Sequence, residues 1–332
     1  MSRLSTLRRQ FGQYVQDADE FAELVADYDH LCELHASGAL PALVLGLGLR
    51  ADYEGGPLKP AIVLHVAAAG PAKTLPIRSK QGFPIYVEVS EPIVLRPAAE
   101  PEAGGPFQAG YSAPPGGVSI GIVGDGAGTL GCFATSQNQV YLISNRHVLD
   151  PTISGTTGLQ VLQQSAPDGG STSVATTRFL SAWSATSPNT ADAGAALMAD
   201  QASSGYNRQQ LVGDNAFRSI VAPDTLATAN ETVMKSGRTT GLTQATVQLL
   251  GAQMSASAGG VTYTFVNCIQ VKNVSGAFQK PGDSGALLVN SSYQPLGLMF
   301  SVDGDKAYAI PIDAAIAALN AAASVTDFAI AF

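Results

Sequence analysis

After Gly117 the chain is a series of short runs rich in valine, isoleucine, threonine and alanine, separated by glycine, asparagine and serine turns. Such residue types, in segments too short for a stable helix, are typical of β-strands joined by tight turns. The whole chain holds 35 glycines and 19 prolines, which also favours many turns. The clearest runs are GVSIGIVG, VYLISN, AALM, ATVQLL, VTYTFV and ALLVN. The pattern predicts a mainly β protein with one closed antiparallel barrel or a pair of barrels.

The segment before this region has a different pattern. Apolar residues recur every three or four positions from Leu4 to Leu34, with acidic residues between them, which predicts one or two amphipathic helices. Residues 42–49, 61–66 and 85–89 have the composition of strands. Residues 1–96 are therefore predicted to form a small α/β domain. Its helix either packs on its own domain or recruits a regulatory protein partner.

Residues 97–117 are rich in proline and glycine and contain few large apolar side chains, so they are predicted to be a linker. At the other end of the chain, the alanine-rich segment IPIDAAIAALNAAA has the composition and spacing of a helix.

Charge and composition exclude several classes of function. The formal charge is −8, from 18 basic and 26 acidic residues, so the protein repels phosphate backbones and anionic lipid surfaces. We expect no nucleic-acid partner and no membrane partner. Residues 42–49, the longest apolar stretch, are far shorter than the roughly 20 residues needed to cross a bilayer.

The cysteines give no sign of a metal site or of a disulfide framework. They are odd in number and widely spaced, which indicates reduced thiols and a cytoplasmic location. They are Cys32, Cys132 and Cys268.

The segment Pro281-Gly282-Asp283-Ser284-Gly285 is the most specific motif in the chain. A serine flanked by glycines before an apolar strand suits a nucleophile. The backbone N–H groups of Gly282 and Ser284 would hold the oxyanion of a tetrahedral intermediate. An ordinary hairpin turn is the alternative interpretation.

A serine nucleophile needs a positioned base, normally a neutral imidazole. Of the four histidines, His30, His35 and His65 lie in the N-terminal domain, where a structural role is the better interpretation. His147 follows the apolar run of VYLISNRHVL, at a strand end in the same β-rich region as Ser284. His147 is the predicted base.

The imidazole must in turn be oriented by a buried carboxylate. Asp192 is surrounded by small apolar residues in ADAGAALM, where an unpaired carboxylate would be costly to bury. Asp192 is therefore the predicted partner of His147. Asp168, in the turn-like segment APDGG, is predicted to be a solvated turn residue.

The order of His147, Asp192 and Ser284, with the segments SNRHVL, DAGAAL and GDSG, resembles the chymotrypsin-like serine peptidases. The further segments AGTLGCF, APDGG and KSGRTTGLTQATV look like those of a bacterial trypsin-like group related to the plant Narrow Leaf protease. The resemblance implies two six-stranded β-barrels, here over residues 118–225 and 226–332, with the C-terminal helix in the second. It also implies peptide-bond hydrolysis through an acyl-enzyme, which needs no metal and no organic cofactor.

The same resemblance implies the roles of individual residues. Ser284 would be the nucleophile, His147 the general acid and base, and Asp192 its orienting carboxylate, with Gly282 and Ser284 as backbone oxyanion donors. The implied substrate pocket would be lined by Phe278, Met299, Phe300 and Ser301. No acidic residue occurs at these positions, so we expect a protein or peptide substrate with apolar or small side chains rather than lysine or arginine.

Two other functions remain open. A catalytically silent module could keep the barrels for binding, although such a module has no need of an intact triad. An esterase of the α/β-hydrolase type would need a G-x-S-x-G elbow with the histidine last in the chain, whereas the motif at Ser284 is GDSGA and His147 comes before it.

Overall fold

The computed structural model describes residues 2–51, 56–67, 78–95, 97–98, 104–202, 204–222, 226–273 and 276–332. The chain is mainly β, as predicted. Its longer helices are α1 (Arg3–Phe11), α2 (Ala18–Ala36) and α4 (Ile312–Ala323), and a single turn forms α3 (Arg146–Leu149). No helix among the described residues is both long enough and apolar enough to cross a membrane.

Six strands of the C-terminal half close into a barrel. They are paired in the order β15-β18-β19-β20-β17-β16, and β15 also pairs with β16, which completes the ring. This is the six-stranded barrel expected for this half of the chain. The strands are β15 (Thr232–Gly237), β16 (Gly241–Ala258), β17 (Val261–Asn273), β18 (Leu287–Asn290), β19 (Pro295–Asp303) and β20 (Lys306–Pro311).

The preceding segment forms a second sheet of eight strands rather than six, in the order β21-β8-β9-β12-β11-β10-β6-β7. One added strand, β21, comes from the C-terminal end of the chain, which was predicted to belong to the other barrel. It pairs with β8 because Phe328 and Ile330 bury their side chains there. The strands are β6 (Ser119–Ile122), β7 (Ala127–Thr129), β8 (Cys132–Ser136), β9 (Gln139–Ser144), β10 (Gln160–Leu162), β11 (Ser173–Leu180), β12 (Gly194–Met198) and β21 (Ala329–Ile330).

The predicted linker is partly built into the fold. Its last residues form β5, which pairs with β13 in a small third sheet, and Phe107 packs against the core of the eight-stranded sheet. The predicted domain boundaries at residues 96 and 225 lie outside the described residues. The third sheet consists of β5 (Pro115–Gly116), β13 (Asn207–Gly213) and β14 (Ala216–Ser219).

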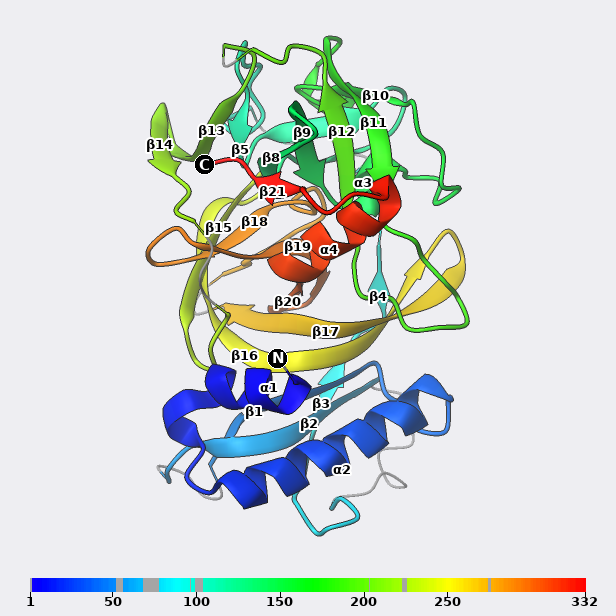
Figure 1. Cartoon of the computed structure of the whole chain (residues 1–332), viewed down its shortest axis with the longest axis vertical. Helices are drawn as coiled ribbons and strands as arrows, with labels where there is room; N and C mark the ends of the chain where they lie inside the picture. The colour runs from blue at the N-terminus through cyan, green and yellow to red at the C-terminus, as the bar shows by residue number, and fades with distance from the viewer. Residues whose placement is uncertain are drawn as a thin grey trace.

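The N-terminal strands extend the barrel sheet instead of forming a sheet of their own (Figure 1). Strand β16 is long, and β15 covers only its first part, from Gly241 to Thr246. Its remaining edge pairs with β1, with Val44 opposite Met254. The β1–β16 pairing joins residues about 200 positions apart, and no local sequence pattern signals such a contact. For this reason the sequence predicts a separate N-terminal domain. The strands are β1 (Val44–Arg50), β2 (Lys59–Ala67), β3 (Ile85–Ser90) and β4 (Ile93–Val94).

The apolar stripe of the N-terminal helices is used within the protein. Leu7, Phe11, Phe21 and Leu24 are at most 4% exposed and share one hydrophobic core with barrel residues such as Val247. The alternative that this stripe recruits a partner is therefore wrong for these side chains. In Figure 1, α1, α2 and β1–β3 lie at the end of the barrel opposite the eight-stranded sheet.

A buried polar cluster also joins the N-terminal strands to the barrel. His65 on β2 is fully buried, and its Nδ1 lies 2.7 Å from Ser90 Oγ. Lys306 on β20 reaches across to Glu88 Oε2 at 3.2 Å, and Arg50 also pairs with Glu88. Burial, reinforced by the Lys306 charge, lowers the pKa of His65 from 6.5 to about 4.

This lowered pKa predicts how stability changes with pH. Between pH 6.5 and 4 the unfolded chain binds a proton at His65 that the folded protein excludes, so acidification favours unfolding. We expect His65 to account for about 3 kcal/mol of unfolding free energy lost over this window. Urea denaturation at both pH values should show a smaller loss for His65→Gln than for wild type. The exposed His30→Gln is the control, and equal losses in all three proteins would contradict the prediction.

Candidate active site

The ends of two paired strands bring His147 and Asp192 together. His147 lies in α3, just after β9, and Asp192 lies just before β12, with Gly194 opposite Ser144 in the β9–β12 pair. His147 Nδ1 is 2.5 Å from Asp192 Oδ2, and the His147 backbone N–H donates to Asp192 Oδ1 at 3.2 Å. Asn145 Nδ2 donates to the Asp192 carbonyl at 2.8 Å, which also fixes the backbone that carries the carboxylate.

The contact with Asp192 decides which imidazole nitrogen is available for chemistry. A carboxylate beside Nδ1 favours the tautomer with the proton on that nitrogen, which leaves Nε2 as the basic nitrogen. His147 Nε2 is buried, and it has no hydrogen-bond partner among the residues that the structure describes. The arrangement therefore holds a base whose reactive nitrogen is not engaged.

The Ser284 loop packs directly against the strand that leads to His147. Gly285 has a φ of +94°, and a Cβ atom at this position would overlap Ser144 Oγ and the Thr129 carbonyl oxygen. The Thr129 N–H donates to the Ser284 carbonyl at 2.8 Å. Since Ser144 precedes His147 by three residues, glycine at 285 lets the serine loop lie close to the histidine turn.

Two backbone N–H groups of this loop have no acceptor within the part of the chain that the structure describes. The N–H groups of Asp283, Gly285 and Ala286 donate to backbone carbonyls. Those of Gly282 and Ser284 make no hydrogen bond within the described part of the chain. An ordinary hairpin turn gives no reason for a pair of unengaged N–H groups beside a serine, whereas an oxyanion hole requires such a pair.

Ser284 is buried, with 5% of the residue exposed, and its Oγ lies 3.5 Å from the Phe300 carbonyl oxygen. This distance is at the outer limit of a hydrogen bond. The contact therefore holds the hydroxyl only weakly.

Asp283, next to Ser284, is fully buried and belongs to a network that sequence reasoning missed. Lys235 Nζ lies 3.4 Å from Asp283 Oδ2, and neither side chain is exposed. Burial lowers the pKa of Lys235, and the Asp283 carboxylate acts in the opposite direction. The carboxylate also accepts hydrogen bonds from the N–H groups of Thr239, Thr240 and Lys280 and from the Thr240 hydroxyl. These contacts fix the shape of the loop from inside the protein.

The predicted substrate-pocket residues are all inside the protein. Phe278 is 2% exposed, Met299 0%, Phe300 1% and Ser301 4%. Phe278 and Met299 lie in the core that the barrel shares with the N-terminal helices, whereas Phe300 packs on Phe265 with ring centroids 5.2 Å apart. Their role as a substrate pocket stays a prediction.

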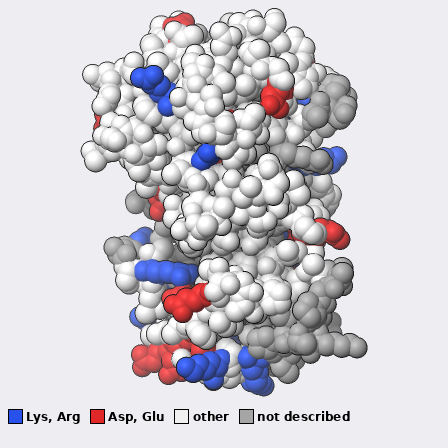
Figure 2. All heavy atoms as spheres, turned by 90° about the vertical axis from the view of Figure 1, so that its right-hand side faces the viewer, with Lys and Arg blue, Asp and Glu red and all other residues white. Residues whose placement is uncertain are grey.

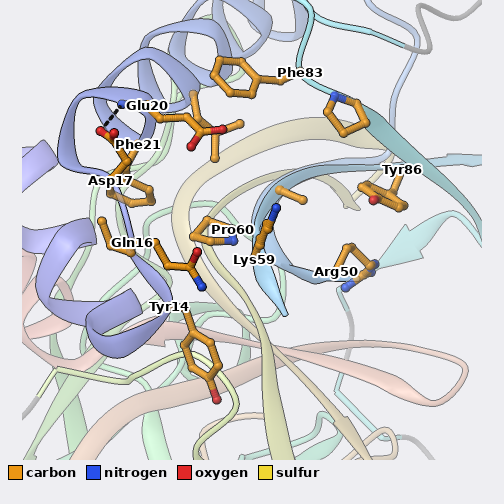
Figure 3. A pocket seen from close by; sticks show the side chains of 14 residues that line it. Tyr14, Gln16, Asp17, Glu20, Phe21, Arg50, Lys59, Pro60, Phe83 and Tyr86 are labelled. Atoms are coloured by element: carbon orange, nitrogen blue, oxygen red, sulfur yellow. Dashed lines mark hydrogen bonds between the residues drawn. The ribbon is translucent and has the colours of Figure 1, made fainter. Parts of the chain in front are cut away.

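Two of the pockets among the described residues, both away from His147 and Ser284, involve the N-terminal helices. One, of about 260 Å³, is formed by the N-terminal unit and is lined by aromatic residues and by the charged Asp17, Glu20, Arg50 and Lys59 (Figure 3). The other, of about 550 Å³, is lined by α1, by α4 and by the last residues of the chain. Among the described residues, no three His, Cys, Asp or Glu side chains gather in a way that could hold a metal ion.

The chain is similar in structure to several proteases. Nocardiopsis protease matches with a TM-score of 0.48 and 16% identity over 66% of this chain and 100% of that one. A glutamic acid-specific serine protease matches with a TM-score of 0.46 and 22% identity over 61% and 96% of the two chains. Thermobifida fusca protease A matches with a TM-score of 0.45 and 18% identity over 62% and 95%.

No protein-family model and no curated protein matches the sequence. The closed six-stranded barrel described above agrees with the barrel predicted for residues 226–332. The predicted grouping with the plant Narrow Leaf protease stays a prediction.

The Lys235–Asp283 pair predicts a large loss of stability on removal of its cation. In Lys235→Met, Asp283 would be left as an unpaired buried carboxylate, so we expect the free energy of unfolding to fall by about 3–5 kcal/mol. Lys272→Met is the matched control, because Lys272 pairs with Asp305 at 3.1 Å on the surface. It should lose at most about 1 kcal/mol. Urea denaturation followed by circular dichroism would measure both, and similar losses would refute the structural role of Lys235.

Proposed function

We propose that this protein is a serine endopeptidase that hydrolyses peptide bonds with Ser284, His147 and Asp192. The observation that carries the proposal is the combination of a buried His147–Asp192 pair with Nε2 unengaged and two unengaged N–H groups at Gly282 and Ser284. Nucleophilic acyl transfer needs each of these parts, and a purely structural site has no use for the combination.

In the proposed reaction Ser284 Oγ attacks the carbonyl carbon of the substrate, and His147 Nε2 accepts the hydroxyl proton. Asp192 stabilises the imidazolium that forms, and the N–H groups of Gly282 and Ser284 bind the oxyanion. His147 then donates the proton to the leaving amine nitrogen as the peptide bond breaks, which leaves an acyl ester on Ser284. A water molecule, deprotonated by His147, hydrolyses this ester and regenerates the serine.

A second candidate is a catalytically silent binding module. The observations that favour it are the contact of Ser284 Oγ with the Phe300 carbonyl and the low exposure of the site. For the peptidase to act, the Ser284 hydroxyl must leave this carbonyl and donate to His147 Nε2.

The first prediction from the proposal concerns covalent labelling. A fluorophosphonate should add once to the wild-type protein, and the modified peptide should contain Ser284. Ser284→Ala and His147→Ala should show no adduct, because activated serine requires both groups. Intact-mass spectrometry measures the adduct, and Ser292→Ala, at an exposed turn of the same barrel, serves as the serine control. Folded wild-type protein without an adduct would favour the binding module.

The second prediction concerns the residue before the cleaved bond. The implied pocket is apolar, and the cation Lys235 Nζ lies 5.4 Å from the centroid of the Phe278 ring. On the face shown in Figure 2, the charged side chains that are described gather toward the end with the N-terminal unit. We therefore expect cleavage after leucine or phenylalanine to exceed cleavage after arginine by at least about tenfold in kcat/KM. A peptide library analysed by mass spectrometry tests this, and faster cleavage after arginine would contradict it.

We also propose that the protein works in a reducing, cytoplasmic compartment, since all three cysteines are free and buried. A regulatory protein partner that binds through residues 1–96 is likewise a proposal. With the apolar stripe of the helices buried, such a partner would bind at the charged surface around the pocket of Figure 3.

A further inference from the structure

The segment KSGRTTG contains a buried charge that the proposed reaction does not use. Arg238 is fully buried and forms a bidentate ion pair with Asp168. Arg238 Nε donates to Asp168 Oδ2 at 2.7 Å, and Arg238 Nη2 donates to Asp168 Oδ1 at 2.6 Å. The hydroxyls of Ser119 and Ser165 donate to the same carboxylate at 2.5 and 2.9 Å. The Asp168 side chain, predicted to be solvated in a turn, is only 1% exposed, and its partner Arg238 lies 70 residues further along the chain.

This ion pair connects the two halves of the protein. Asp168 ends a short 3₁₀ helix (Ala166–Asp168) between β10 and β11 of the eight-stranded sheet, whereas Arg238 follows β15 of the barrel. Burial raises the pKa of Asp168, but the hydrogen bonds and charge of Arg238 and the serine hydroxyls outweigh it and hold the pKa below its ordinary value. The pair is thus ionised at neutral pH, with a fixed planar geometry.

Arg238 is linked through Thr239 to the backbone at Gly282. Arg238 Nη1 donates to Thr239 Oγ1 at 3.2 Å, so the Thr239 hydroxyl directs its own proton elsewhere. It donates to the Pro281 carbonyl oxygen at 2.8 Å. In a planar trans peptide, the carbonyl of Pro281 and the N–H of Gly282 point in opposite directions. A hydrogen bond that holds the Pro281 carbonyl therefore also aims the Gly282 N–H.

A second contact holds the other side of Gly282. The Arg238 backbone N–H donates to Thr129 Oγ1 at 3.0 Å, and the Thr129 hydroxyl donates to the Gly282 carbonyl at 2.8 Å. Gly282 has a φ of +98°, and a Cβ atom there would overlap Thr239 Oγ1. Both peptide planes at Gly282 are therefore held by groups that the Arg238 segment orients.

We infer that Asp168, Arg238 and Thr239 are positioning residues that aim the Gly282 N–H at the oxyanion. The inference rests on the proposed peptidase function, because it assigns the Gly282 N–H to the oxyanion hole. None of the three side chains is assigned a contact with substrate. The charge of Asp168, in one half of the protein, orients the guanidinium, and Thr239 transmits that orientation to the donor in the other half.

The first test needs no activity. The chain contains two Pro-Gly bonds, Pro115–Gly116 and Pro281–Gly282. Carbonyl-¹³C proline with ¹⁵N glycine therefore gives two cross-peaks in a carbonyl-filtered amide spectrum. We expect the Pro281 carbonyl peak to move upfield in Thr239→Val, which lacks the hydroxyl, and to stay in place in Thr239→Ser. Asp168→Asn should move it in the same direction, while the Pro115 peak stays fixed in all variants.

The second test is kinetic and separates positioning from mere stability. Thr239→Val and Asp168→Asn should each lower kcat about 10- to 100-fold, with KM within about twofold of wild type, because a misaimed donor weakens transition-state binding. The kcat of the double variant should be no more than about threefold below that of the less active single variant, because both substitutions interrupt the same chain of contacts. Thr239→Ser, which keeps the hydroxyl, should retain the kcat of the wild type. Thr228→Val, which removes a hydroxyl that donates to Glu231 Oε2 at 3.3 Å on the surface, is the matched control and should keep wild-type kinetics.

The outcomes distinguish the two proposals. A wild-type protein that neither labels at Ser284 nor cleaves peptides refutes the peptidase, and the carbonyl shifts still decide whether Asp168 and Thr239 hold the Pro281–Gly282 peptide. An unmoved Pro281 peak in Asp168→Asn overturns the inference, as do additive losses in the double variant or a wild-type kcat in Thr239→Val. If Asp168→Asn does not fold, the comparison of Thr239→Val with Thr239→Ser still decides the role of the hydroxyl.

Discussion

The close approach of two backbones at Gly285 decides how the halves of this protein meet. A side chain at this position would overlap both Ser144 and Thr129, and a side chain at Gly131 would overlap the Gly285 carbonyl. Because both positions are glycines and carry no side chain, the Ser284 loop lies directly on the eight-stranded sheet. Thr129 is then in place to bond Ser284 and Gly282, and Ser144 leads into the histidine turn. The candidate site is therefore a consequence of this contact rather than of either half alone.

Buried charge determines the rest of the arrangement. Three carboxylates with no or almost no exposure lie around the contact, and each is held by a different kind of group: Asp192 by His147, Asp283 by Lys235 and Asp168 by Arg238. An unpaired charge in such surroundings would cost several kcal/mol, so each carboxylate specifies its partner strongly. The three pairs differ in chemistry. The imidazole of His147 leaves one nitrogen without a hydrogen bond among the described residues, whereas the lysine and arginine pairs lie against backbone that they help to hold in place.

The parts of the site that sequence reasoning could identify were those whose chemistry demands a particular residue. An activated serine needs an imidazole and an imidazole needs a carboxylate, so residue types and their small apolar neighbours singled out His147 and Asp192, which do lie in contact. The prediction of a solvated Asp168 was wrong because the turn composition around it gives no information about an arginine that follows a distant strand. Lys235 was missed for a related reason, since its partner Asp283 was considered only as part of a turn. The pairing of β1 with β16 also depends on a long-range register that local patterns do not contain.

Strand β16 connects these observations with the N-terminal unit. It begins at Gly241, directly after Thr240, whose N–H and hydroxyl hold Asp283, and its later part carries β1. The Ser284 loop and the N-terminal strands are thus attached to different ends of one strand that is paired along both edges. A one-residue slip in the register of this strand would turn its buried side chains outward, so the buried side chains hold both ends in one alignment. The N-terminal unit therefore supports the barrel through this strand, whereas in the inferred arrangement the aim of the Gly282 N–H is set from the eight-stranded sheet.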